Sequence, residues 1–462
     1  MNIPAPSGIP EAVTAAILVG DEILLVHRNP KLHAFAGYEA FAGGKVEAGD
    51  DAPCCLACAR DSAQDSVIPP RRVNALVREI REELGFDLVA LEQAGELTAF
   101  GEVGYALTPP IAPRRFSTWF YRLRLRHKPA LTLNPPEHTA AGWATPAAWL
   151  ARYAAGDLLL VPPTRFALQD LADNPETTQL SRMDAIGKPP TGGRFIEIQP
   201  LGGITILAVP SNTLPPAHHT NCFLIGDGTA EAPRLLVDPS PKDDATLAAL
   251  IAQVEGRCDA VFITHHHPDH HERADALARR CNLPIWLSAD TRTRIAIAHP
   301  HFFDGIPVRE LADGETLTRW LGHPVHVLAV PGHDAGQLAL LPDNRAWCLV
   351  GDLIQGIGTV VIAPPEGDMA RYFKTLEHVI ALAPRVIFPS HGMALGGTHY
   401  LEAALAHRRL REGQILALHR SGKSEDEILA VVYAGTPPPL LPYARVNIRS
   451  HLTKLDAEQR LG

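Results

Sequence analysis

Histidine and aspartate residues gather in one short stretch of the chain, from Thr264 to His271. Five His and one Asp stand within the seven residues 265–271, and burying so many polar side chains is costly unless a metal ion binds them. The stretch follows an apolar segment, and two of its residues, His265 and His267, can point to the same side of an extended turn. Imidazole nitrogens and carboxylate oxygens favour Zn²⁺, with Fe or Mn as alternatives.

This stretch resembles the HxHxDH motif of the metallo-β-lactamase fold, and further segments are similar to that family in the same order. These segments are Thr220–Gly226, Leu236–Asp238, Pro331–His333, Gly351–Asp352 and Pro389–Gly392. The resemblance implies an αββα sandwich over residues 195–400 that holds two metal ions. It assigns His265, His267 and His333 to one ion, Asp269, His270 and His391 to the second, and Asp352 to both.

Two cations bound close together lower the pKa of a shared water and stabilise developing negative charge. The resemblance therefore implies hydrolysis of a thioester, an ester or a phosphodiester, with Asp269 also expected to take part in catalysis. His266 and His271 are expected to lie outside the set of ligands. The short apolar segments of this region end in Gly, Asp or His, which predicts strands with functional loops at their ends.

A second candidate site lies on residues 75–84, which are expected to form a helix that ends at Gly85. Glu79, Glu82 and Glu83 are three and four positions apart, so they share one face of that helix. Their like charges repel, and a divalent cation such as Mg²⁺ or Mn²⁺ would neutralise them. The alternative is a charged helix face that is simply solvated.

The segments 44–50 and 78–86 together resemble a Nudix box, whose second half matches at every defined position. The first half has Asp50 in place of the usual Glu, and an insertion of 20 residues separates the two halves. Residues 24–44 also resemble the coenzyme A signature of that family. The matching residues are Arg28, Gly37, Phe41, Gly43 and Gly44, whereas Asn29, His33 and Ala42 depart from it.

This second resemblance implies a Nudix α/β/α sandwich over residues 1–187 that cleaves a diphosphate of coenzyme A or of a nucleotide. It implies Mg²⁺ or Mn²⁺ on Glu82 and Glu83, with Glu79 as a ligand or catalytic base. Arg28, Gly43 and Gly44 would contact the substrate, since a glycine pair lets the backbone approach a ligand closely. Loss of activity because of the insertion is the alternative.

Proline and glycine cluster in residues 187–193, which predicts a linker over residues 188–194. From about residue 400 the pattern becomes helical, over 401–419, 424–432 and 443–455. Residues 407–455 resemble the winged-helix-like unit of the lactamase-β-like protein 2 group, some of whose members cleave single-stranded RNA. A winged-helix-like unit is therefore expected over residues 401–462, and a helical cap that packs or dimerises is the alternative.

The composition limits the partners of the chain. Its 42 Lys+Arg and 51 Asp+Glu give a net charge of −9, which argues against a nucleic-acid coat or a polybasic membrane binder. No apolar run approaches the length of a transmembrane helix. The seven cysteines, an odd number, favour a reduced, cytoplasmic location over a disulfide scaffold. The inserted Cys54, Cys55 and Cys58 lack a second pair and are expected to be ordinary helix cysteines.

The sequence thus predicts a multidomain α/β and α+β protein that acts as a two-site metallohydrolase on a nucleotide or an acyl-coenzyme A. One alternative is an endoribonuclease whose N-terminal domain reads RNA ends. Another is a hydrolase regulated by a Nudix domain that senses nucleotides without cleaving them. A homo-oligomer is compatible with each of these hypotheses.

Overall fold

The computed structural model describes residues 8–57, 68–110, 112, 114–186 and 193–461. The chain forms two compact units, one of Met1–Thr191 with Ile198–Gly202 and one of Gly192–Glu197 with Gly203–Gly462. Residues 188–192 of the predicted linker over residues 188–194 lie outside the described residues. Within the described ranges, no helix combines the length and the apolar character that crossing a membrane requires.

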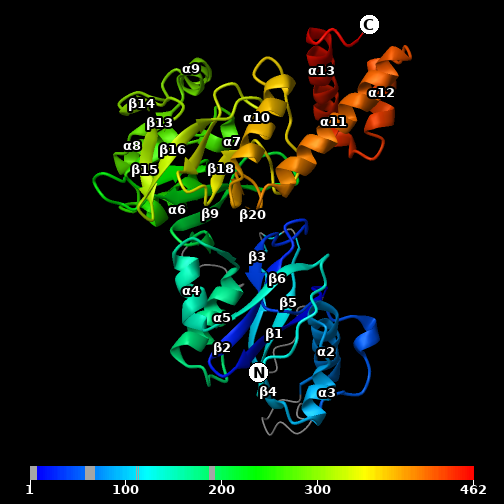
Figure 1. Ribbon diagram of the computed structural model, residues 1–462. Coiled ribbons are helices and arrows are strands. Elements are labelled where there is room, and N and C mark those ends of the chain that lie inside the picture. The colour runs from blue at the N-terminus through cyan, green and yellow to red at the C-terminus, as the bar shows by residue number, and fades with distance from the viewer. Residues whose placement is uncertain (1–7, 58–67, 111, 113, 187–192, 462) are drawn as a thin grey trace. The chain divides into compact units, whose positions relative to one another are not determined.

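The first unit is built on a mixed seven-stranded sheet in the order β4-β5-β1-β2-β3-β7, with β6 paired to β2 (Figure 1). Its strands are β1 (Glu11–Val19), β2 (Glu22–Arg28), β3 (Tyr38–Ala40), β4 (Leu97–Leu107), β5 (Ser117–Leu125), β6 (His138–Ala144) and β7 (Leu159–Leu160). The hairpin expected around Gly20 and Asp21 is formed by β1 and β2, which pair antiparallel.

Helices cover both faces of this sheet, because alternate side chains of β1 point to opposite sides. Val13 and Ile17 pack on the face covered by α2, and Ala16 and Leu18 pack on the face covered by α4 and α5. The helices are α2 (Pro70–Leu84), α3 (Leu88–Gln93), α4 (Pro146–Ala154) and α5 (Pro162–Asp173), with 3-10 turns η1 (Ala48–Asp50) and η2 (Ser181–Ala185). The layers are α/β/α, and the Nudix assignment stays a prediction.

The predicted end of α2 is confirmed, since Gly85 caps it in the left-handed conformation with φ 76°. The inserted cysteines differ from expectation. Cys54 and Cys55 lie in non-helical chain and pack against the core beneath α2. The expectation of helix cysteines is therefore wrong for these two, and Cys58 lies outside the described residues.

The second unit contains two sheets. One includes the order β14-β13-β12-β11-β10-β9, and the other is β15-β16-β17-β18-β19-β20. The first has β9 (Ile204–Pro210), β10 (His219–Ile225), β11 (Leu235–Val237), β12 (Ala260–Phe262), β13 (Ile285–Leu287) and β14 (Val308–Glu310). The second has β15 (Thr316–Trp320), β16 (His323–Ala329), β17 (Leu338–Pro342), β18 (Cys348–Gly351), β19 (Val386–Pro389) and β20 (Leu395–Gly396). β8 (Glu197–Leu201) spans the boundary between the units.

The two sheets face each other and helices cover their outer sides. The rings of Phe223 and Phe388, one from each sheet, lie 5.8 Å apart at their centroids. α6 (Asp244–Val254), α8 (Ala274–Cys281) and α9 (Ala289–Ala298) pack on the first sheet, and α10 (Met369–Leu382) and α11 (His399–Arg420) pack on the second. The short α7 (Pro268–His271) lies within the histidine stretch. The expected αββα arrangement is confirmed.

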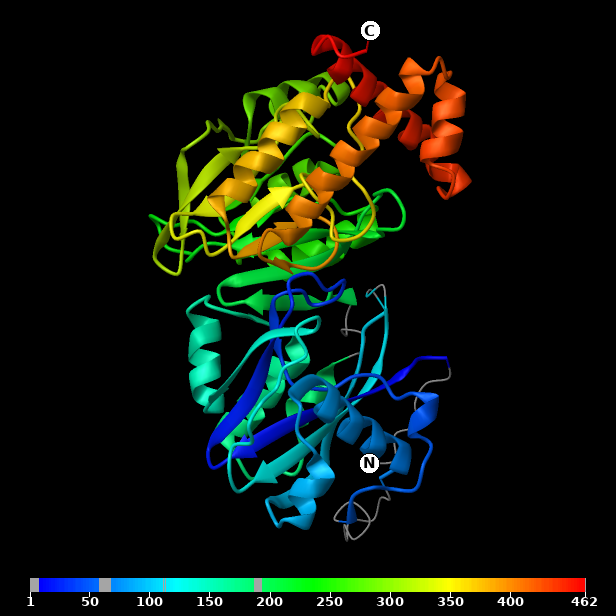
Figure 2. The same ribbon diagram turned by 45° about the vertical axis from the view of Figure 1, so that its right-hand side comes forward.

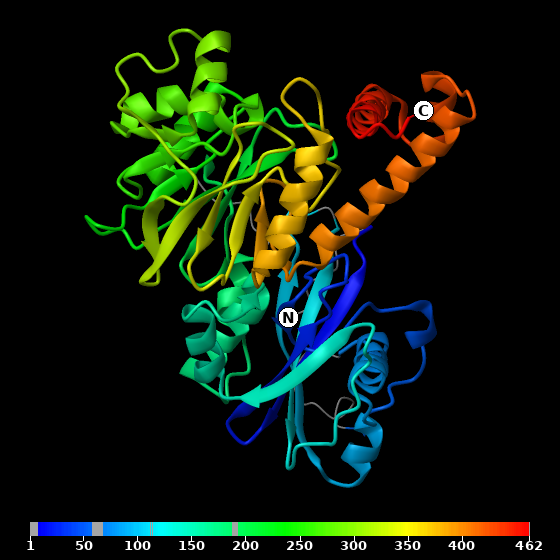
Figure 3. The ribbon, with the colours of Figure 1, turned by 45° about the horizontal axis from the view of Figure 1, so that its top comes forward.

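The chain ends in a small helical region. α11 continues past α10, and α12 (Glu425–Val432), η4 (Pro438–Leu440) and α13 (Leu441–Ala457) follow it (Figures 2 and 3). Ser424 and Glu427 form a capping box at the start of α12. Ile448 of α13 is fully buried and shares a core with Ile415 of α11 and Ile428 of α12, so the helical C-terminal unit is confirmed.

Candidate metal centre

The candidate ligands of the second unit follow strands whose carboxyl ends meet at one edge. β11 and β12 are parallel neighbours, so Asp238 and the stretch 264–271 leave the first sheet side by side. β18 and β19 are also parallel neighbours, which brings Asp352 close to His391 in the second sheet. The main-chain N–H of Asn221 in β10 donates to the carbonyl of Ser390 at 2.7 Å and joins the two edges.

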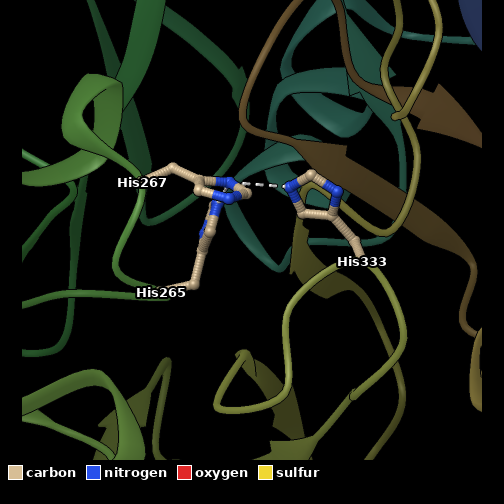
Figure 4. Close-up of side chains that lie close together, drawn as sticks. All are labelled: His265, His267 and His333. Carbon is tan, nitrogen blue, oxygen red and sulfur yellow. Dashed lines mark hydrogen bonds between the residues drawn. The ribbon is translucent and has the colours of Figure 1, made fainter. Parts of the chain in front are cut away.

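Three imidazoles converge in the first group of side chains (Figure 4). Nε2 of His265 lies 3.0 Å from Nδ1 of His267, and Nε2 of His333 lies 3.0 Å from the same Nδ1. His265 and His333 are buried, and His267 is half-buried. Three nitrogens so close together, on loops that follow strands of two different sheets, can bind one cation such as Zn²⁺.

The second group is formed by Asp269, His270 and His391. Oδ2 of Asp269 lies 3.5 Å from Nε2 of His391. Asp352 lies between the two groups, with Oδ1 3.7 Å from Nε2 of His270 and Oδ2 3.9 Å from Nε2 of His333. The structure thus brings together all seven side chains that the sequence singled out, and Asp352 faces both groups.

Unpaired buried atoms test whether this donor set fits metal ions. Nε2 of His270, Nε2 of His391 and Oδ1 of Asp352 are buried and have no hydrogen-bond partner among the described residues. Such atoms normally find a partner, because an unsatisfied buried polar group is costly. The three atoms lie close together, with Oδ1 of Asp352 3.7 Å from Nε2 of His270 and 3.6 Å from Nε2 of His391. Nitrogen and carboxylate donors in this arrangement fit two divalent cations.

Four of the five imidazoles are oriented by a hydrogen bond at Nδ1. The partners of Nδ1 are the Thr264 hydroxyl for His265 at 3.0 Å, the Asp238 carboxylate for His270 at 2.9 Å, the Val361 carbonyl for His333 at 2.8 Å and the His219 carbonyl for His391 at 3.0 Å. Each bond directs Nε2 at the centre. His267 is the exception, since it presents Nδ1.

Asp238 is a functional residue to which the sequence analysis assigned no role. Its carboxylate is fully buried and accepts from the N–H of Thr264 at 2.8 Å, from the Thr264 hydroxyl at 2.7 Å and from Nδ1 of His270. Since the hydroxyl donates to Asp238, it accepts from Nδ1–H of His265. One carboxylate therefore sets the tautomers of two candidate ligands. The sequence feature that could have identified Asp238 is its position directly after a short apolar strand.

Burial and nearby charge shift the histidine pKa values in opposite directions in the two groups. Burial lowers the pKa of His265 well below its ordinary value and lowers the pKa of His267 to about 3, so both rings are neutral. Burial also acts to lower the pKa of His270, but the carboxylates of Asp269 and Asp352 outweigh it and raise that pKa. The second group therefore favours a positive charge at its centre, which a metal ion supplies.

His266 and His271, which stand beside candidate ligands in the sequence, contact groups other than the two sets of ligand atoms. His266 pairs with the Asp334 carboxylate, and Nε2 of His271 interacts with the carbonyl of His266 at 2.8 Å. His266, His267 and Asp334 form a further cluster of close ligand atoms. Neither His266 nor His271 belongs to the two groups around Asp352.

The glutamates on α2 of the first unit have a different environment. Arg78 donates to Asp50 through Nε at 3.0 Å, to Glu79 at 2.9 Å and to Glu82 at 3.3 Å. Glu82 is exposed, whereas Glu83 is buried and accepts from the N–H of Gly43 at 2.8 Å. A protein cation therefore already neutralises two of the three carboxylates.

The three glutamates share α2 as predicted, but within the described part of the chain they do not form a group of close ligand atoms. Glu83 forms such a group with Glu137 and His138, and its Oε1 lies 3.1 Å from Nε2 of His138. Neither partner was singled out from the sequence, and their position at the start of β6 offered no spacing signal. Arg28, at the end of β2, donates to the carbonyl of Ala34 at 3.2 Å.

The glycine pair allows the Glu79 carboxylate to approach the backbone. A Cβ at Gly44 would lie 2.3 Å from Oε1 of Glu79, and one at Gly43, whose φ is 151°, would lie 2.1 Å from the Val13 carbonyl oxygen. Burial raises the pKa of Glu79 to about 7 despite the opposing effect of Arg78. Glu79 is therefore poised to exchange a proton near neutral pH.

Known proteins resemble the second unit most clearly. Residues 215–391 match the family model of the Metallo-beta-lactamase superfamily, and residues 424–461 match that of the Beta-lactamase associated winged helix domain. The Beta-lactamase-like protein 2 homolog of Drosophila melanogaster is 30% identical over 253 residues, which are 52% of this chain and 84% of that protein. The Hydroxyacylglutathione hydrolase of Nitrosomonas europaea is 27% identical over 171 residues, which are 37% of this chain and 59% of that protein.

A solved structure of a NUDIX hydrolase from Alicyclobacillus acidocaldarius covers 40% of this chain and 100% of its own, at 24% identity and a TM-score of 0.30. At that score the Nudix assignment of the first unit stays a prediction. The relatives of the second unit and its αββα layers lead to a firmer conclusion: the chain is a metal-dependent hydrolase and belongs to the metallo-beta-lactamase superfamily.

Proposed function

We propose that the second unit is a dinuclear metallohydrolase that cleaves acyl thioesters. The observation that carries this proposal is the convergence of seven side chains with ligand atoms. Three of these atoms are buried and have no hydrogen-bond partner among the described residues. In this proposal one ion is held by His265, His267 and His333, the other by Asp269, His270 and His391, and Asp352 is shared. Zinc suits this donor set best.

Two cations bound there supply a Lewis acid and lower the pKa of a water, which is the chemistry that hydrolysis of an acyl bond requires. The residues of the chain hold the donors in place for it. Asp238 and Thr264 hold Nδ1 of two imidazoles, His270 and His265, and so aim Nε2 of each ring inward. Nε2 of Gln355 donates to Oδ2 of Asp352 at 3.0 Å and limits the rotation of the shared carboxylate.

A thioester fits the groups at this centre. A thiol has a pKa near 8.5, so a thiolate can leave without being protonated first. The site therefore needs no proton donor for the leaving group, in contrast to cleavage of an ordinary ester. The similarity to a hydroxyacylglutathione hydrolase, whose name denotes a thioester substrate, supports the same class.

The winged-helix region offers little support for RNA as the substrate, because its cations are engaged within the protein. Residues 401–462 contain nine Lys+Arg and seven Asp+Glu. Six of the nine pair with carboxylates, namely Arg409, Lys423, Arg445, Arg449, Lys454 and Arg460. The other three, Arg408, Arg411 and Arg420, donate to main-chain carbonyls. A surface that binds phosphates by releasing counterions needs cations that are not engaged in this way.

The test is a substrate panel with the full chain loaded with Zn²⁺. Release of free thiol from a hydroxyacyl-glutathione and from acyl-coenzyme A is followed with a thiol reagent, and cleavage of a single-stranded RNA is followed in parallel. We expect thiol release that a chelator abolishes and added Zn²⁺ restores. RNA cleavage without thiol release would replace the thioester proposal by the endoribonuclease alternative.

A second candidate function belongs to the first unit: Mg²⁺-dependent cleavage of a diphosphate in coenzyme A or a nucleotide. The raised pKa of Glu79 beside the Gly43-Gly44 pair favours it, since a carboxylate with a pKa of about 7 is suited to be a base. In this proposal Glu82 and Glu83 bind the cation, and Arg28, Gly43 and Gly44 contact the substrate.

Release of 3′,5′-ADP from coenzyme A by the wild type and by Glu79→Gln tests the second function. Loss of a general base lowers the rate by about 10²- to 10⁴-fold, while thioester cleavage should stay unchanged. Nucleotide binding by the wild type without turnover would instead support a Nudix domain that only senses nucleotides.

A further inference from the structure

We infer that Arg408 and Asn447, from the helical C-terminal region, are positioning residues for the metal ligand His333. They act through the segment Val360–Ile362, whose middle residue orients the imidazole. The inference rests on the proposed dinuclear site and assigns its C-terminal helices a role at that site, which their distance from the ligands in the sequence does not suggest.

The main chain of His333 is fixed by α10. Gly332 lies so close to this helix that a Cβ there would be 2.3 Å from Cα of Tyr372. The carbonyl of Gly332 accepts from the N–H of Asp368 at 2.8 Å. What remains free is the rotation of the ring, and the bond of 2.8 Å from Nδ1 to the Val361 carbonyl sets it.

The Val361 carbonyl needs an outside support, because it lies between β18 and α10, where no helix or strand holds the backbone. Its two neighbours are held by the C-terminal helices. Arg408 of α11 donates to the carbonyl of Val360, and Oδ1 of Asn447 on α13 accepts from the N–H of Ile362 at 2.9 Å. The Ile362 N–H belongs to the same peptide plane as the Val361 carbonyl, and the Val360 carbonyl belongs to the plane before it. The two bonds therefore fix the plane of the Val361 carbonyl and the plane that precedes it.

Both supports act where water does not compete. Arg408 is 7% exposed and Asn447 is 4% exposed, and Val360 and Ile362 are buried in the core shared by α10 and α11. A guanidinium bond to a carbonyl is charge-assisted and stronger than a neutral one. Loss of either partner leaves a buried main-chain group unsatisfied, so the segment would shift to find another.

The two helices that carry these residues are joined to each other. Glu412, one turn after Arg408 on α11, accepts from Nζ of Lys454 at 2.8 Å, and Nδ1 of His451 lies 3.3 Å from its other oxygen. Both partners belong to α13, as does Asn447. Arg408 and Asn447 therefore hold fixed positions relative to each other, as a support for a metal ligand requires.

Arg409 provides a matched control. It is the next residue on α11 and pairs with Glu377 of α10, so it also joins the helical region to the αββα layers. Its side chain is half exposed and does not reach the Val360–Ile362 segment. Arg408→Met and Arg409→Met remove the same charge one residue apart, and only the first acts on His333.

The experiment is a Co²⁺ titration of the full chain, followed by visible absorption, which reports both affinity and ligand geometry. We expect Asn447→Leu and Arg408→Met to weaken one of the two Co²⁺ equivalents by about 3- to 10-fold, below the roughly 10- to 100-fold typical of groups that contact a ligand directly. The absorption band of that equivalent should shift as well. Asn447→Asp, which retains an acceptor oxygen, and Arg409→Met should titrate like the wild type.

Wild-type titrations and spectra for Asn447→Leu and Arg408→Met would overturn the inference, as would an equal loss in Arg409→Met. If Asn447→Leu does not fold, as judged by circular dichroism, the two arginine variants decide the outcome. A wild-type chain that binds no Co²⁺ is a different result, because it overturns the proposed metal centre itself.

Discussion

The two candidate sites differ in what their donor atoms contact. In the second unit, Asp238, Thr264 and main-chain carbonyls bind the outer nitrogens of the imidazoles, and the inner nitrogens are left facing one another. In the first unit the carboxylates of α2 are themselves bound, by Arg78 and by the N–H of Gly43. One set of donors is held open for a cation, and the other is already satisfied by the protein.

The comparison shows that having ligand side chains of the right type is different from holding them in place for a cation. Both sites have enough donors of the right chemical type, but the second unit leaves three of its buried ligand atoms without a hydrogen-bond partner among the described residues. Fixed donors lose little conformational entropy when a cation binds, whereas a cation at α2 has to compete with the Arg78 guanidinium. We therefore expect tight metal binding in the second unit and weaker, substrate-assisted binding in the first.

The largest expected effect comes from removing the nitrogen that the first group shares. His267→Ala deletes the Nδ1 that lies 3.0 Å from two other imidazoles. Substitution of a residue that only hydrogen-bonds to a metal ligand typically lowers metal affinity or activity by about 10- to 100-fold. Because His267 is itself a proposed ligand, we expect thioester cleavage to fall by more than about 100-fold. Diphosphate cleavage should not change, and neither activity should change in His301→Ala, an exposed imidazole. A parallel loss of both activities would contradict separate sites.

A smaller effect on metal binding is expected when all seven candidate ligands are kept and only a residue that hydrogen-bonds to them is changed. Asp238→Asn should lower Zn²⁺ affinity about 10- to 100-fold, because the NH₂ group of an amide cannot accept and one oxygen cannot serve all the donors that Asp238 now binds. Asn tolerates the left-handed backbone of this position, φ 49°. Zinc content after dialysis against a weak chelator measures the change.

Asp227→Asn is the control for that experiment. Its carboxylate accepts from the N–H groups of Leu321 and Gly322, in a turn outside the two ligand groups. Equal zinc retention in Asp238→Asn and in the wild type would show that the imidazoles do not need their carboxylate partner.

The smallest effect is a pH-dependent change in stability at α2. Burial raises the pKa of Glu79 from 4.5 to about 7, so between these values the folded state binds more protons than the unfolded state. The free energy of unfolding then falls as pH rises through this window, and the full penalty is present above pH 7. Glu79→Gln should therefore melt above the wild type at pH 8, by an amount that vanishes below pH 4.5.

Melting curves with and without Mg²⁺ extend this test to the cation. Mg²⁺ should raise the melting temperature of the wild type at pH 8 and leave Glu79→Gln unaffected, because a cation relieves a penalty that the amide does not carry. Glu176→Gln is the control, since Glu176 is exposed and pairs with Arg122 and Arg124 of β5 rather than with residues of α2. A stabilisation by Glu79→Gln that grows as pH falls would contradict the raised pKa.

Sequence patterns predicted much of the fold because each was local to one element. The capping box of α12 involves Ser424 and Glu427, which are three residues apart. The left-handed Gly85 directly follows the last residue of α2. The insertion before α2 gave no such pattern, and there the expectation of helical cysteines at Cys54 and Cys55 was wrong. Their contacts come from the core beneath them, which the local sequence does not encode.

By itself, the sequence determined which residues could bind metal and in what order along the chain they occur, because donor type and spacing belong to the chain. Only the tertiary structure decided which nitrogen of each imidazole faces the centre, and that His333 depends on Val361, Arg408 and Asn447. It also decided that Glu83 contacts His138 rather than its neighbours on α2. Such partners come from distant elements, and packing rather than spacing brings them within hydrogen-bond distance.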